Sequence, residues 1–333
     1  RRFPRQADLD RALCDLDGTP AKGRLGANAI LAVSVAFARA AAAEDGVALH
    51  RYLGAQAGEE HGGLPRPFVN LFSGGAHAGG QVGVQDVQLV VRSADTVGDA
   101  LAAVAAVYRR AVDLAADRYG MRLLRADEGG LAPPFASSDD MLAACVECIA
   151  QAGLRPGVDV ALAVDVAASQ LGSAASGYEL DGERLDSAGL AGRVARWLRE
   201  YPIASLEDPL GEEDWDGWQA LAGAMGDVLL VGDDLLCTQT ARIEAAIERS
   251  AANALLLKPN QVGTLTEAAD ALRLARSAGW TVVVSARSGE TEDAWLADVA
   301  VGWAAEHVKI GSITQSERLA KYNRLLELER TLR

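Results

Sequence analysis

VALAVDVAAS at residues 160–169 is the first of four short apolar runs that each carry a charged residue at or near their end, the others being IASLEDPL (203–210), VLLVGDDL (228–235) and ALLLKPN (254–260). Helical stretches separate these runs, and such alternation of strand and helix predicts a parallel sheet. Parallel strands end at the same rim of a sheet, which is where functional residues of barrel folds gather. At that rim we expect three carboxylates and one amine, from Asp165, Glu207, Asp233 and Lys258.

The same alternation of strand-like and helical stretches extends over most of the chain. Strand-like runs lie at 68–73, 84–91, 122–127, 160–166, 203–207, 228–233, 254–258, 281–285 and 306–311. No G-x-G-x-x-G follows a first strand, and polar residues collect at many strand ends. Both features favour a closed (β/α)8 barrel of TIM type over an open doubly wound sheet. Only the loop SGGAHAGGQVG separates the first two runs, so we expect the barrel to begin with a hairpin.

The N-terminal part differs from the rest. Residues 1–58 are Ala-rich and helical in pattern, with no strand of their own, and glycines and prolines follow between 62 and 67. We therefore expect two domains: a partial, helical N-terminal capping domain at 1–58 and the barrel at 59–333.

Composition limits the possible partners. A chain of 333 residues with half of them apolar can bury a large core. A net charge of −14 argues against nucleic acid and against anionic membrane surfaces. RRFPRQADLD is not an apolar leader, and charges interrupt the apolar stretches before they reach bilayer length. Four scattered cysteines do not make a disulfide framework, which fits a reducing cytoplasm. Cys145 and Cys148 lie inside a helical pattern, where they are expected to be structural.

The converging acids predict a metal site. Three carboxylates at one point stay ionised only if a cation neutralises them. Oxygen ligands without clustered His or Cys select a hard ion, and we expect Mg²⁺ held by Asp165, Glu207 and Asp233. The alternative is that each acid caps the helix that follows it.

Lys258 is the expected base. Apolar leucines precede it and Pro259 follows, which favours an extended strand end. Beside a bound metal its pKa is expected to fall, so that the neutral amine can accept a proton. Lys309 is expected to be a second inward amine that holds an anion. The alternative for either is a solvated surface lysine.

Further candidates lie at strand ends and in loops. Asp86 and Glu128 supply two more acids, and Glu128 is placed to act as a general acid opposite Lys258. Arg287 and Ser288 offer a guanidinium and a hydroxyl for a phosphate or phosphonate, and His77 offers an imidazole. A base, an acid, a metal and an anion clamp predict removal of a proton α to a carboxylate followed by loss of water, which is the reaction of a lyase.

Successive segments of the chain resemble the enolase family (phosphopyruvate hydratase): LGANAILAVS, SGGAHAGG, ADEGGLAP, VDVAAS, SLEDPL, VGDDLLCT, LLLKPNQVGTLTE, RSGETED and KIGSITQSERLAKYNRLLELE. The resemblance covers nearly the whole chain. It implies a barrel that starts ββαα, a homodimer or higher homo-oligomer, and a small phosphorylated or phosphonate carboxylic acid as substrate. It also implies the roles given above: metal ligands at 165, 207 and 233, the base at 258, the acid at 128, and substrate contacts at His77, Arg287, Ser288 and Lys309.

The departures from the family pattern lie on the substrate side. Asp86 stands where the family has a catalytic glutamate, which withdraws the carboxylate by about 1.5 Å. Ala286 stands where the family has an active-site histidine. Pro259 and Gln315 are smaller changes. The resemblance also places the first residue about halfway through the family's N-terminal domain, so the serine-bearing loop that closes over the site is not in this sequence.

These changes enlarge the site beside Ala286. They favour a bulkier substrate than 2-phosphoglycerate, such as a carboxyphosphono-glycerate dehydrated to carboxyphosphonoenolpyruvate, the reaction of enolase-like enzymes in phosphonate antibiotic biosynthesis. Two alternatives stay open. One is an ordinary glycolytic enolase that tolerates the substitutions, and the other is a non-enzymatic enolase-like binding protein.

Overall fold

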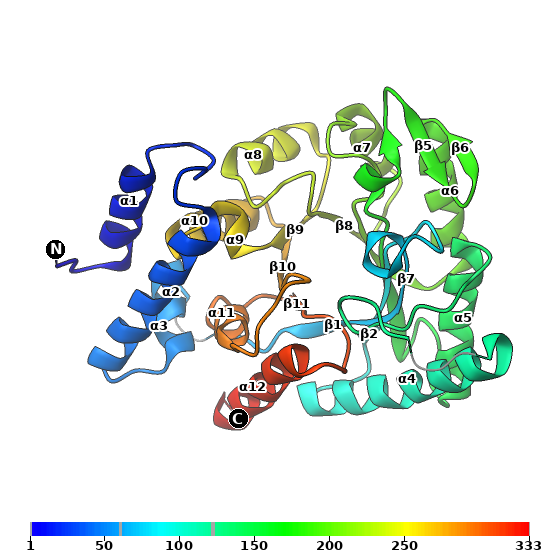
Figure 1. Ribbon diagram of the computed structural model, residues 1–333, viewed down its shortest axis with the longest axis horizontal. Coiled ribbons are helices and arrows are strands. Elements are labelled where there is room, and N and C mark those ends of the chain that lie inside the picture. Colours follow the sequence, from blue (N-terminus) through cyan, green and yellow to red (C-terminus); the bar gives the residue numbers. More distant parts are fainter. Residues whose placement is uncertain (1, 60–61, 121–123, 333) are drawn as a thin grey trace.

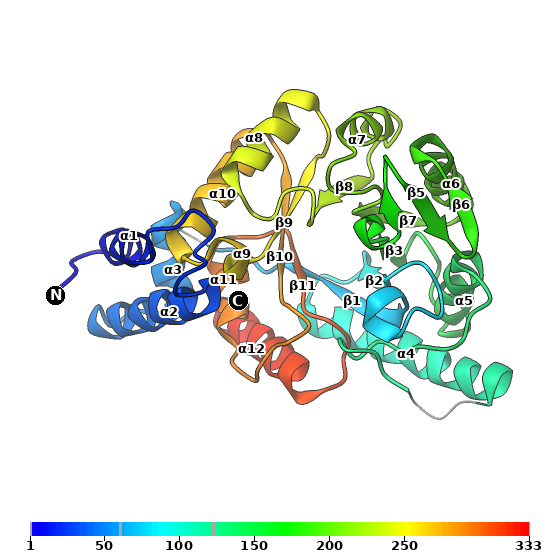
Figure 2. The ribbon, with the colours of Figure 1, turned by 45° about the horizontal axis from the view of Figure 1, so that its top comes forward.

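The protein folds as a closed barrel with helices around it, flanked by three N-terminal helices, in a computed structural model that describes residues 2–59, 62–120 and 124–332 (Figures 1 and 2). The barrel strands are β1 (Arg66–Ser73), β2 (Asp86–Val91), β3 (Val160–Asp165), β7 (Ile203–Glu207), β8 (Leu229–Gly232), β9 (Ala254–Leu257), β10 (Thr281–Ser285) and β11 (His307–Lys309). Their order around the barrel is β1-β11-β10-β9-β8-β7-β3-β2. The predicted TIM-type barrel is confirmed.

The barrel starts with a hairpin, as predicted. β1 pairs antiparallel with β2, and β2 pairs antiparallel with β3, whereas the other neighbours are parallel. Two helices then precede β3, so the chain begins ββαα. The helices after the hairpin are α4 (Val97–Tyr119), α5 (Ser138–Gln151), α6 (Ser187–Glu200), α7 (Trp215–Ala222), α8 (Thr240–Arg249), α9 (Pro259–Val262), α10 (Leu265–Ser277), α11 (Trp295–Gly302) and α12 (Ser316–Leu332).

The register of β1 against β2 contains a bulge. Asn70 lies opposite Gln88, but Phe72 lies opposite Val87, so β1 carries one extra residue at this point. Side chains three positions apart on a regular strand point to opposite faces. The bulge changes that alternation and turns Ser73 to the same side as Asn70.

Two core layers hold the barrel. Aliphatic and aromatic side chains fill its interior: Phe68, Val90, Ala163, Val231, Ala254, Leu256 and Val283. A much larger cluster lies between the outer face of the strands and the surrounding helices. Inward and outward positions alternate along each strand, which is why the strands are apolar almost throughout.

Two segments differ from the expectation. The predicted strand at 122–127 lies partly outside the described residues, and among residues 124–127 only Arg125 forms an isolated bridge, with Leu131. A small antiparallel sheet after β3 was not predicted. Its strands are β4 (Gly172–Ser173), β5 (Gly177–Leu180) and β6 (Glu183–Leu185). The short strands escape detection because two to four residues are too few for a periodic pattern.

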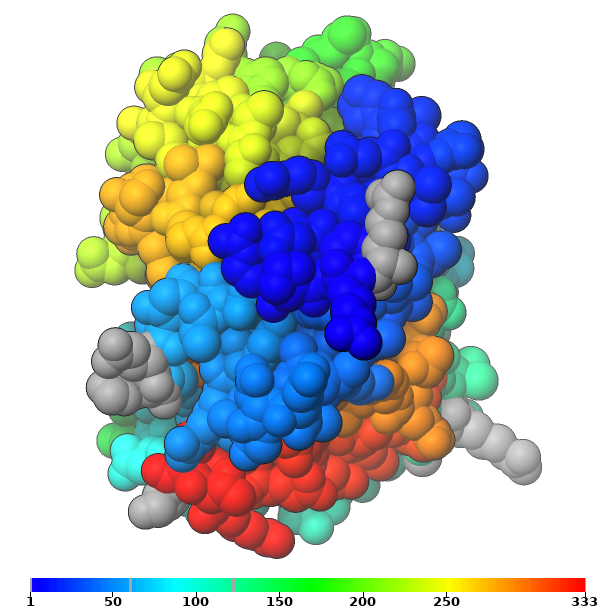
Figure 3. Space-filling model, turned by 90° about the vertical axis from the view of Figure 1, so that its left-hand side faces the viewer, coloured from blue at the N-terminus to red at the C-terminus, as the bar shows by residue number. Residues whose placement is uncertain are grey.

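The N-terminal helices are α1 (Gln6–Asp17), α2 (Ala27–Glu44) and α3 (Leu49–Ala57). They lie beside α9, α10 and α11, and Figure 3 shows the blue N-terminal segment against the yellow and orange part of the chain. The N-terminal helices are hydrogen-bonded to the first turn of α10. Ser34 Oγ accepts the Leu265 N–H at 3.1 Å, and Asp10 Oδ2 accepts the Thr266 N–H at 3.0 Å. An acid at a helix N-terminus is favoured by the helix dipole, so these contacts fix the segment on the barrel.

Among the described helices, α2 alone is long and apolar enough to cross a bilayer by length and composition. Core helices of globular proteins meet the same criterion, and Ser34 and Val35 of α2 are buried against the rest of the fold.

Candidate active site

The candidate residues meet at one rim of the barrel, around a cavity of about 160 Å³. β2 runs opposite to its neighbours, so its first residue lies at the rim where the parallel strands end. Asp86 therefore pairs in register with Asp165, and Asp165 with Glu207. Nine of the eleven predicted site residues line the cavity: His77, Glu128, Asp165, Asp233, Lys258, Ala286, Arg287, Ser288 and Lys309. The other two, Asp86 and Glu207, stand behind them.

Lys309 lies between two of the predicted metal ligands. Its Nζ is 2.8 Å from Asp165 Oδ2 and 2.8 and 2.7 Å from the two oxygens of Glu207. Burial would lower the pKa of Lys309, but the charges of Asp165 and Glu207 raise it well above its usual range. Burial and the charge of Asp165 raise the pKa of Glu207 in turn. The ammonium therefore offsets part of the repulsion between two buried carboxylates.

Lys258 pairs with the third ligand. Its Nζ donates to Asp233 Oδ2. Burial would lower the pKa of Lys258, but the charge of Asp233 raises it. The lowered pKa expected for a base is therefore not found while this pair is intact. To accept a proton, Lys258 has to leave Asp233 and lose its own proton.

A strained turn supports this pair. Cys237 and Thr238 both have left-handed backbone angles, with φ of 45° and 55°, which non-glycine residues adopt at a cost of about 1–3 kcal/mol each. Thr238 Oγ1 accepts the Lys258 N–H at 2.9 Å and donates to Gln261 Oε1 at 2.6 Å. Gln261 Nε2 donates to Asp233 Oδ1 at 3.1 Å. The turn therefore links Lys258 and Asp233 through the side-chain amide of Gln261.

The two further acids form a second cluster on the opposite wall. His77, on η1 (Gly75–Ala78), brings Nδ1 to 2.7 Å from Asp86 Oδ2. Asn70 Nδ2 donates to Asp86 Oδ1 at 2.8 Å and to Glu128 Oε2 at 3.1 Å, and Ser73 Oγ also donates to Asp86 Oδ1. Burial alone would lower the pKa of His77, but the hydrogen bond and charge of Asp86 raise it to about 9. His77 is therefore an imidazolium at neutral pH.

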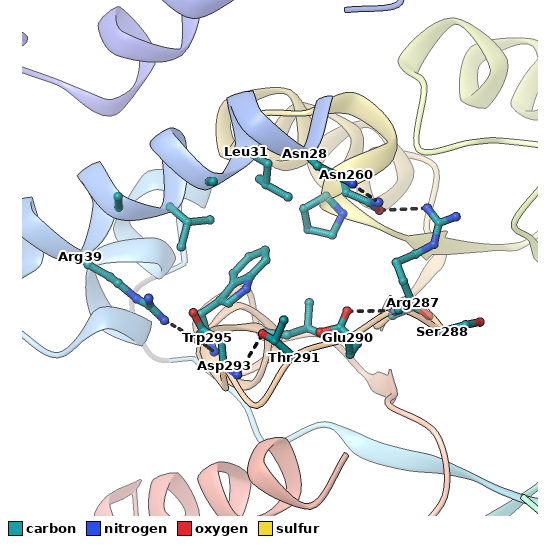
Figure 4. A pocket seen from close by; sticks show the side chains of 17 residues that line it. Asn28, Leu31, Arg39, Asn260, Arg287, Ser288, Glu290, Thr291, Asp293 and Trp295 are labelled. Carbon is teal, nitrogen blue, oxygen red and sulfur yellow. Dashed lines mark hydrogen bonds and ion pairs between the residues drawn. The ribbon is translucent and has the colours of Figure 1, made fainter. Parts of the chain in front are cut away.

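The residues predicted to hold an anion, Arg287 and Ser288, also line the cavity. Ser288 Oγ is 3.1 Å from His77 Nε2 and donates to Glu128 Oε1 at 3.3 Å. Arg287 Nη1 donates to Asn260 Oδ1 at 3.0 Å. Figure 4 shows Arg287 at the edge of a neighbouring pocket of about 620 Å³ between α2 and the loop before α11. Ala286 is buried, with 4% of the residue exposed, and is one of the residues that line the cavity.

Several supporting residues were not predicted. Arg318 is fully buried and donates to the carbonyl oxygens of Arg287 and Ser288, both at 2.7 Å. Asn70 and Gln261 are neutral residues whose function depends on a bulge or a tight turn. Only a charged residue could have been recognised in the sequence as a candidate, and of these three residues only Arg318 is charged.

The donor set fits a hard divalent ion. Carboxylates of Asp165, Glu207 and Asp233 come from neighbouring strand ends, and the ammonium groups of Lys258 and Lys309 are paired with them, so the cluster attracts positive charge. Among the described residues, the acid groups whose ligand atoms lie within 4.8 Å of one another are Asp208, Asp233 and Asp234, and, with a histidine, His77, Asp86 and Glu128; of the three predicted ligands only Asp233 belongs to one of them. Asp208 accepts the backbone N–H groups of Asp233 and Asp234, so it orients this turn.

Comparison with known proteins agrees with this arrangement. The family described as "Enolase, C-terminal TIM barrel domain" matches residues 61–333, and "Enolase, N-terminal domain" matches residues 2–53. The chain belongs to the enolase family. It is 48% identical over 325 residues to the protein described as Enolase from Mycobacteroides abscessus, covering 97% of this chain and 75% of that relative.

As an enolase-family member the chain is a Mg²⁺-dependent hydro-lyase that acts on a small phosphorylated carboxylic acid. The two family matches fall on either side of the predicted boundary between 1–58 and 59–333, and that division stays a prediction.

Proposed function

We propose that this enolase-family chain dehydrates 2-phosphoglycerate to phosphoenolpyruvate. The observation that carries the proposal is the pair of opposed walls: Lys258 beside Asp233 on one side of the cavity, Glu128 with Ser288 and His77 on the other. A substrate held between them presents its C2 hydrogen to an amine and its C3 hydroxyl to a carboxylic acid. The 48% identity to a curated enolase supports the same reaction.

The proposed step balances as an elimination. Neutral Lys258 takes the proton from C2, the C2–C3 double bond forms, and the C3–oxygen bond breaks. Glu128 gives its proton to the departing hydroxide, so that water leaves. Asp165, Glu207 and Asp233 would hold Mg²⁺, which when bound would supply positive charge for the substrate carboxylate. Arg287 and Ser288 hold the phosphate, and His77 adds a second positive charge to that wall.

A bulkier substrate is the second candidate. Ala286 has only a methyl side chain, and Asp86 is fully buried, hydrogen-bonded to Asn70, Ser73 and His77, and does not line the cavity. Both side chains are shorter than the histidine and the glutamate that the family resemblance implies at these positions, so we expect more space on the substrate side. A carboxyphosphono-glycerate, dehydrated to carboxyphosphonoenolpyruvate as in phosphonate antibiotic biosynthesis, would use that space. The similarity to the curated enolase favours the first candidate.

One assay separates the candidates. We expect Mg²⁺-dependent turnover of 2-phosphoglycerate by the wild-type protein, followed through formation of the enol phosphate, with a higher kcat/KM than on the carboxyphosphono analogue. Lys258→Ala should abolish turnover, whereas Arg110→Ala, on the exposed face of α4, should leave it intact. Turnover of the analogue alone would select the second candidate. Absence of turnover on both would leave a non-enzymatic binding protein.

Assembly and location complete the proposal. The family resemblance supports a homodimer, and four free cysteines, two of them fully buried, fit a reducing cytoplasm. Light scattering on the purified protein tests the dimer. A monomer at the concentration used for activity measurements would refute it.

A further inference from the structure

Asn70 joins the two acids of the site through a single amide nitrogen. Nδ2 carries two hydrogens, and it donates to Asp86 Oδ1 at 2.8 Å and to Glu128 Oε2 at 3.1 Å. All three side chains are buried, with Asn70 only 1% exposed. Two carboxylates that share the two hydrogens of one rigid donor are held at a fixed separation.

The oxygen of the Asn70 amide is left without a hydrogen bond to any described residue in this arrangement. Asn70 Oδ1 is buried and has no hydrogen-bond partner among the residues that the structure describes. Turning the amide over would place this oxygen against two carboxylate oxygens, which is repulsive. A buried acceptor without a partner destabilises the fold. The unpaired oxygen of Asn70 is tolerated because the nitrogen of the same amide binds both acids.

The bulge in β1 creates this arrangement. Asn70 and Ser73 are three residues apart, yet both donate to Oδ1 of Asp86. On a regular strand they would point to opposite faces, and the extra residue between Asn70 and Phe72 turns Ser73 inward. Bulges next to active sites redirect side chains in this way. Gly130 permits the close approach, because a Cβ there would lie 2.4 Å from Ser73 Oγ and 3.5 Å from Asn70 Cβ.

The two acids are left in different situations. Asp86 is completely buried, does not line the cavity, and has both oxygens occupied by Asn70, Ser73 and His77. Glu128 lines the cavity, with Oε2 held by Asn70 and Oε1 facing Ser288 at 3.3 Å. One oxygen of Glu128 is therefore fixed and the other is presented to the substrate side.

We propose that Asn70 is a positioning residue that orients Glu128 as the general acid and secures Asp86 as the support of His77. The inference rests on the proposed dehydration and adds that Asn70 acts on the acids and not on Lys258. Asn70 serves the acid wall and does not touch the base. Loss of its amide should therefore impair departure of the hydroxide while leaving proton removal by Lys258 intact.

Two measurements on the same substrate test this inference. Exchange of the C2 hydrogen with solvent deuterium depends on the base, whereas formation of the enol phosphate also needs the acid. For Asn70→Ala we expect elimination to fall by about 10- to 100-fold, as for loss of one hydrogen bond to a charged group. The rate of C2 hydrogen exchange should stay within about threefold of the wild-type rate, which is a smaller change than the tenfold that corresponds to 1.36 kcal/mol. The ratio of exchange to elimination is independent of the fraction of folded protein.

A matched control uses the residue opposite in the sheet. Gln88 is buried, pairs with Asn70 in register, and its Nε2 has no partner among the described residues. Gln88→Ala removes a buried amide without touching either acid, so the ratio should remain that of the wild type. Asn70→Asp puts a third carboxylate between the two acids and should raise the ratio at least as much as Asn70→Ala.

The outcomes are distinct. An unchanged ratio in Asn70→Ala with an active wild-type protein would overturn this inference and leave the dehydration standing. An equal rise of the ratio in Gln88→Ala would also overturn it, because the effect would then belong to packing. Wild-type protein that neither exchanges nor eliminates would overturn the proposed function and this inference together.

Discussion

Lys309→Met tests whether the lysine ammonium serves as the cation of the carboxylate cluster. Methionine keeps most of the side-chain volume and removes the charge that lies 2.7–2.8 Å from three oxygens of Asp165 and Glu207. Removing one partner of a buried ion pair costs about 3–5 kcal/mol, because the remaining charge is buried without compensation. Two carboxylates lose their partner here, so we expect a loss of free energy of unfolding in the upper half of that range.

The loss should depend on Mg²⁺. A divalent ion bound to the same oxygens replaces the missing charge, and without the ammonium it has no competitor. We expect Mg²⁺ to bind the variant at least tenfold more tightly than the wild type, which reduces the difference in unfolding free energy by about 1.4 kcal/mol or more at saturating metal. Urea unfolding of both proteins, in a metal chelator and in excess Mg²⁺, measures the four free energies.

Lys321→Met is the matched control. Lys321 is also fully buried, and its Nζ lies 2.9 Å from Glu290 Oε2 and 2.7 Å from the Thr291 carbonyl oxygen. Its removal should destabilise the protein equally with and without Mg²⁺, because Glu290 is not among the proposed ligands. A loss below about 1 kcal/mol for Lys309→Met, set against the range for buried pairs, would contradict the reasoning. So would a loss that is the same with and without Mg²⁺.

Three further perturbations have defined outcomes. The pKa of His77 is raised to about 9, so its pairing with Asp86 stabilises the fold fully below the unfolded value near 6.5 and is lost as pH rises through 9. His77→Gln should therefore destabilise the protein at pH 6 and have little effect on unfolding free energy above pH 9.5, and equal losses at both pH values would count against the pairing. Ala286→His places a larger side chain at the rim. Turnover of a carboxyphosphono substrate should then fall about tenfold, which is the size of effect expected when a pocket no longer fits one substrate, while turnover of 2-phosphoglycerate holds or rises. Unchanged kinetics on both substrates would show that residue 286 does not discriminate between them. Arg318→Lys cannot make the two hydrogen bonds to the carbonyl oxygens of 287–288, so KM for the phosphorylated substrate should rise about tenfold with kcat nearly kept; a lower kcat at constant KM would place Arg318 elsewhere in the reaction.

The barrel was predictable because its pattern is long and repeated. Aliphatic strands that alternate with capped helices fix the order of elements, as in α10, where Thr264 accepts the Glu267 N–H at 3.1 Å and caps the predicted helix. The hairpin start also followed from one short glycine-rich loop. The sheet β4–β6 did not, because its strands are too short for periodicity to register.

The site was predictable to the level of residue type and strand end. Charged residues at Asp165, Glu207 and Lys258 sit where the rim of the barrel requires them. Partners within the site were not predictable, because they depend on register. The pairing of Lys309 with two carboxylates was not predicted, and its expected role in holding an anion stays a prediction. Asn70 reaches both acids only through a bulge.

The antiparallel second strand has a consequence for how this site can change. In a parallel strand the loop that follows it carries the functional residue, but Asp86 begins β2 and is positioned by the loop that precedes it. That loop also carries His77, so residues 74–86 bring a cation and its counter-ion to the rim as one continuous piece. Exchange of this single segment between relatives would transplant both partners together with their hydrogen bond. The pair of Asp86 and His77 can therefore be acquired by one local replacement, whereas the pair of Asp233 and Lys258, which comes from the ends of β8 and β9, requires coordinated changes in separate parts of the chain.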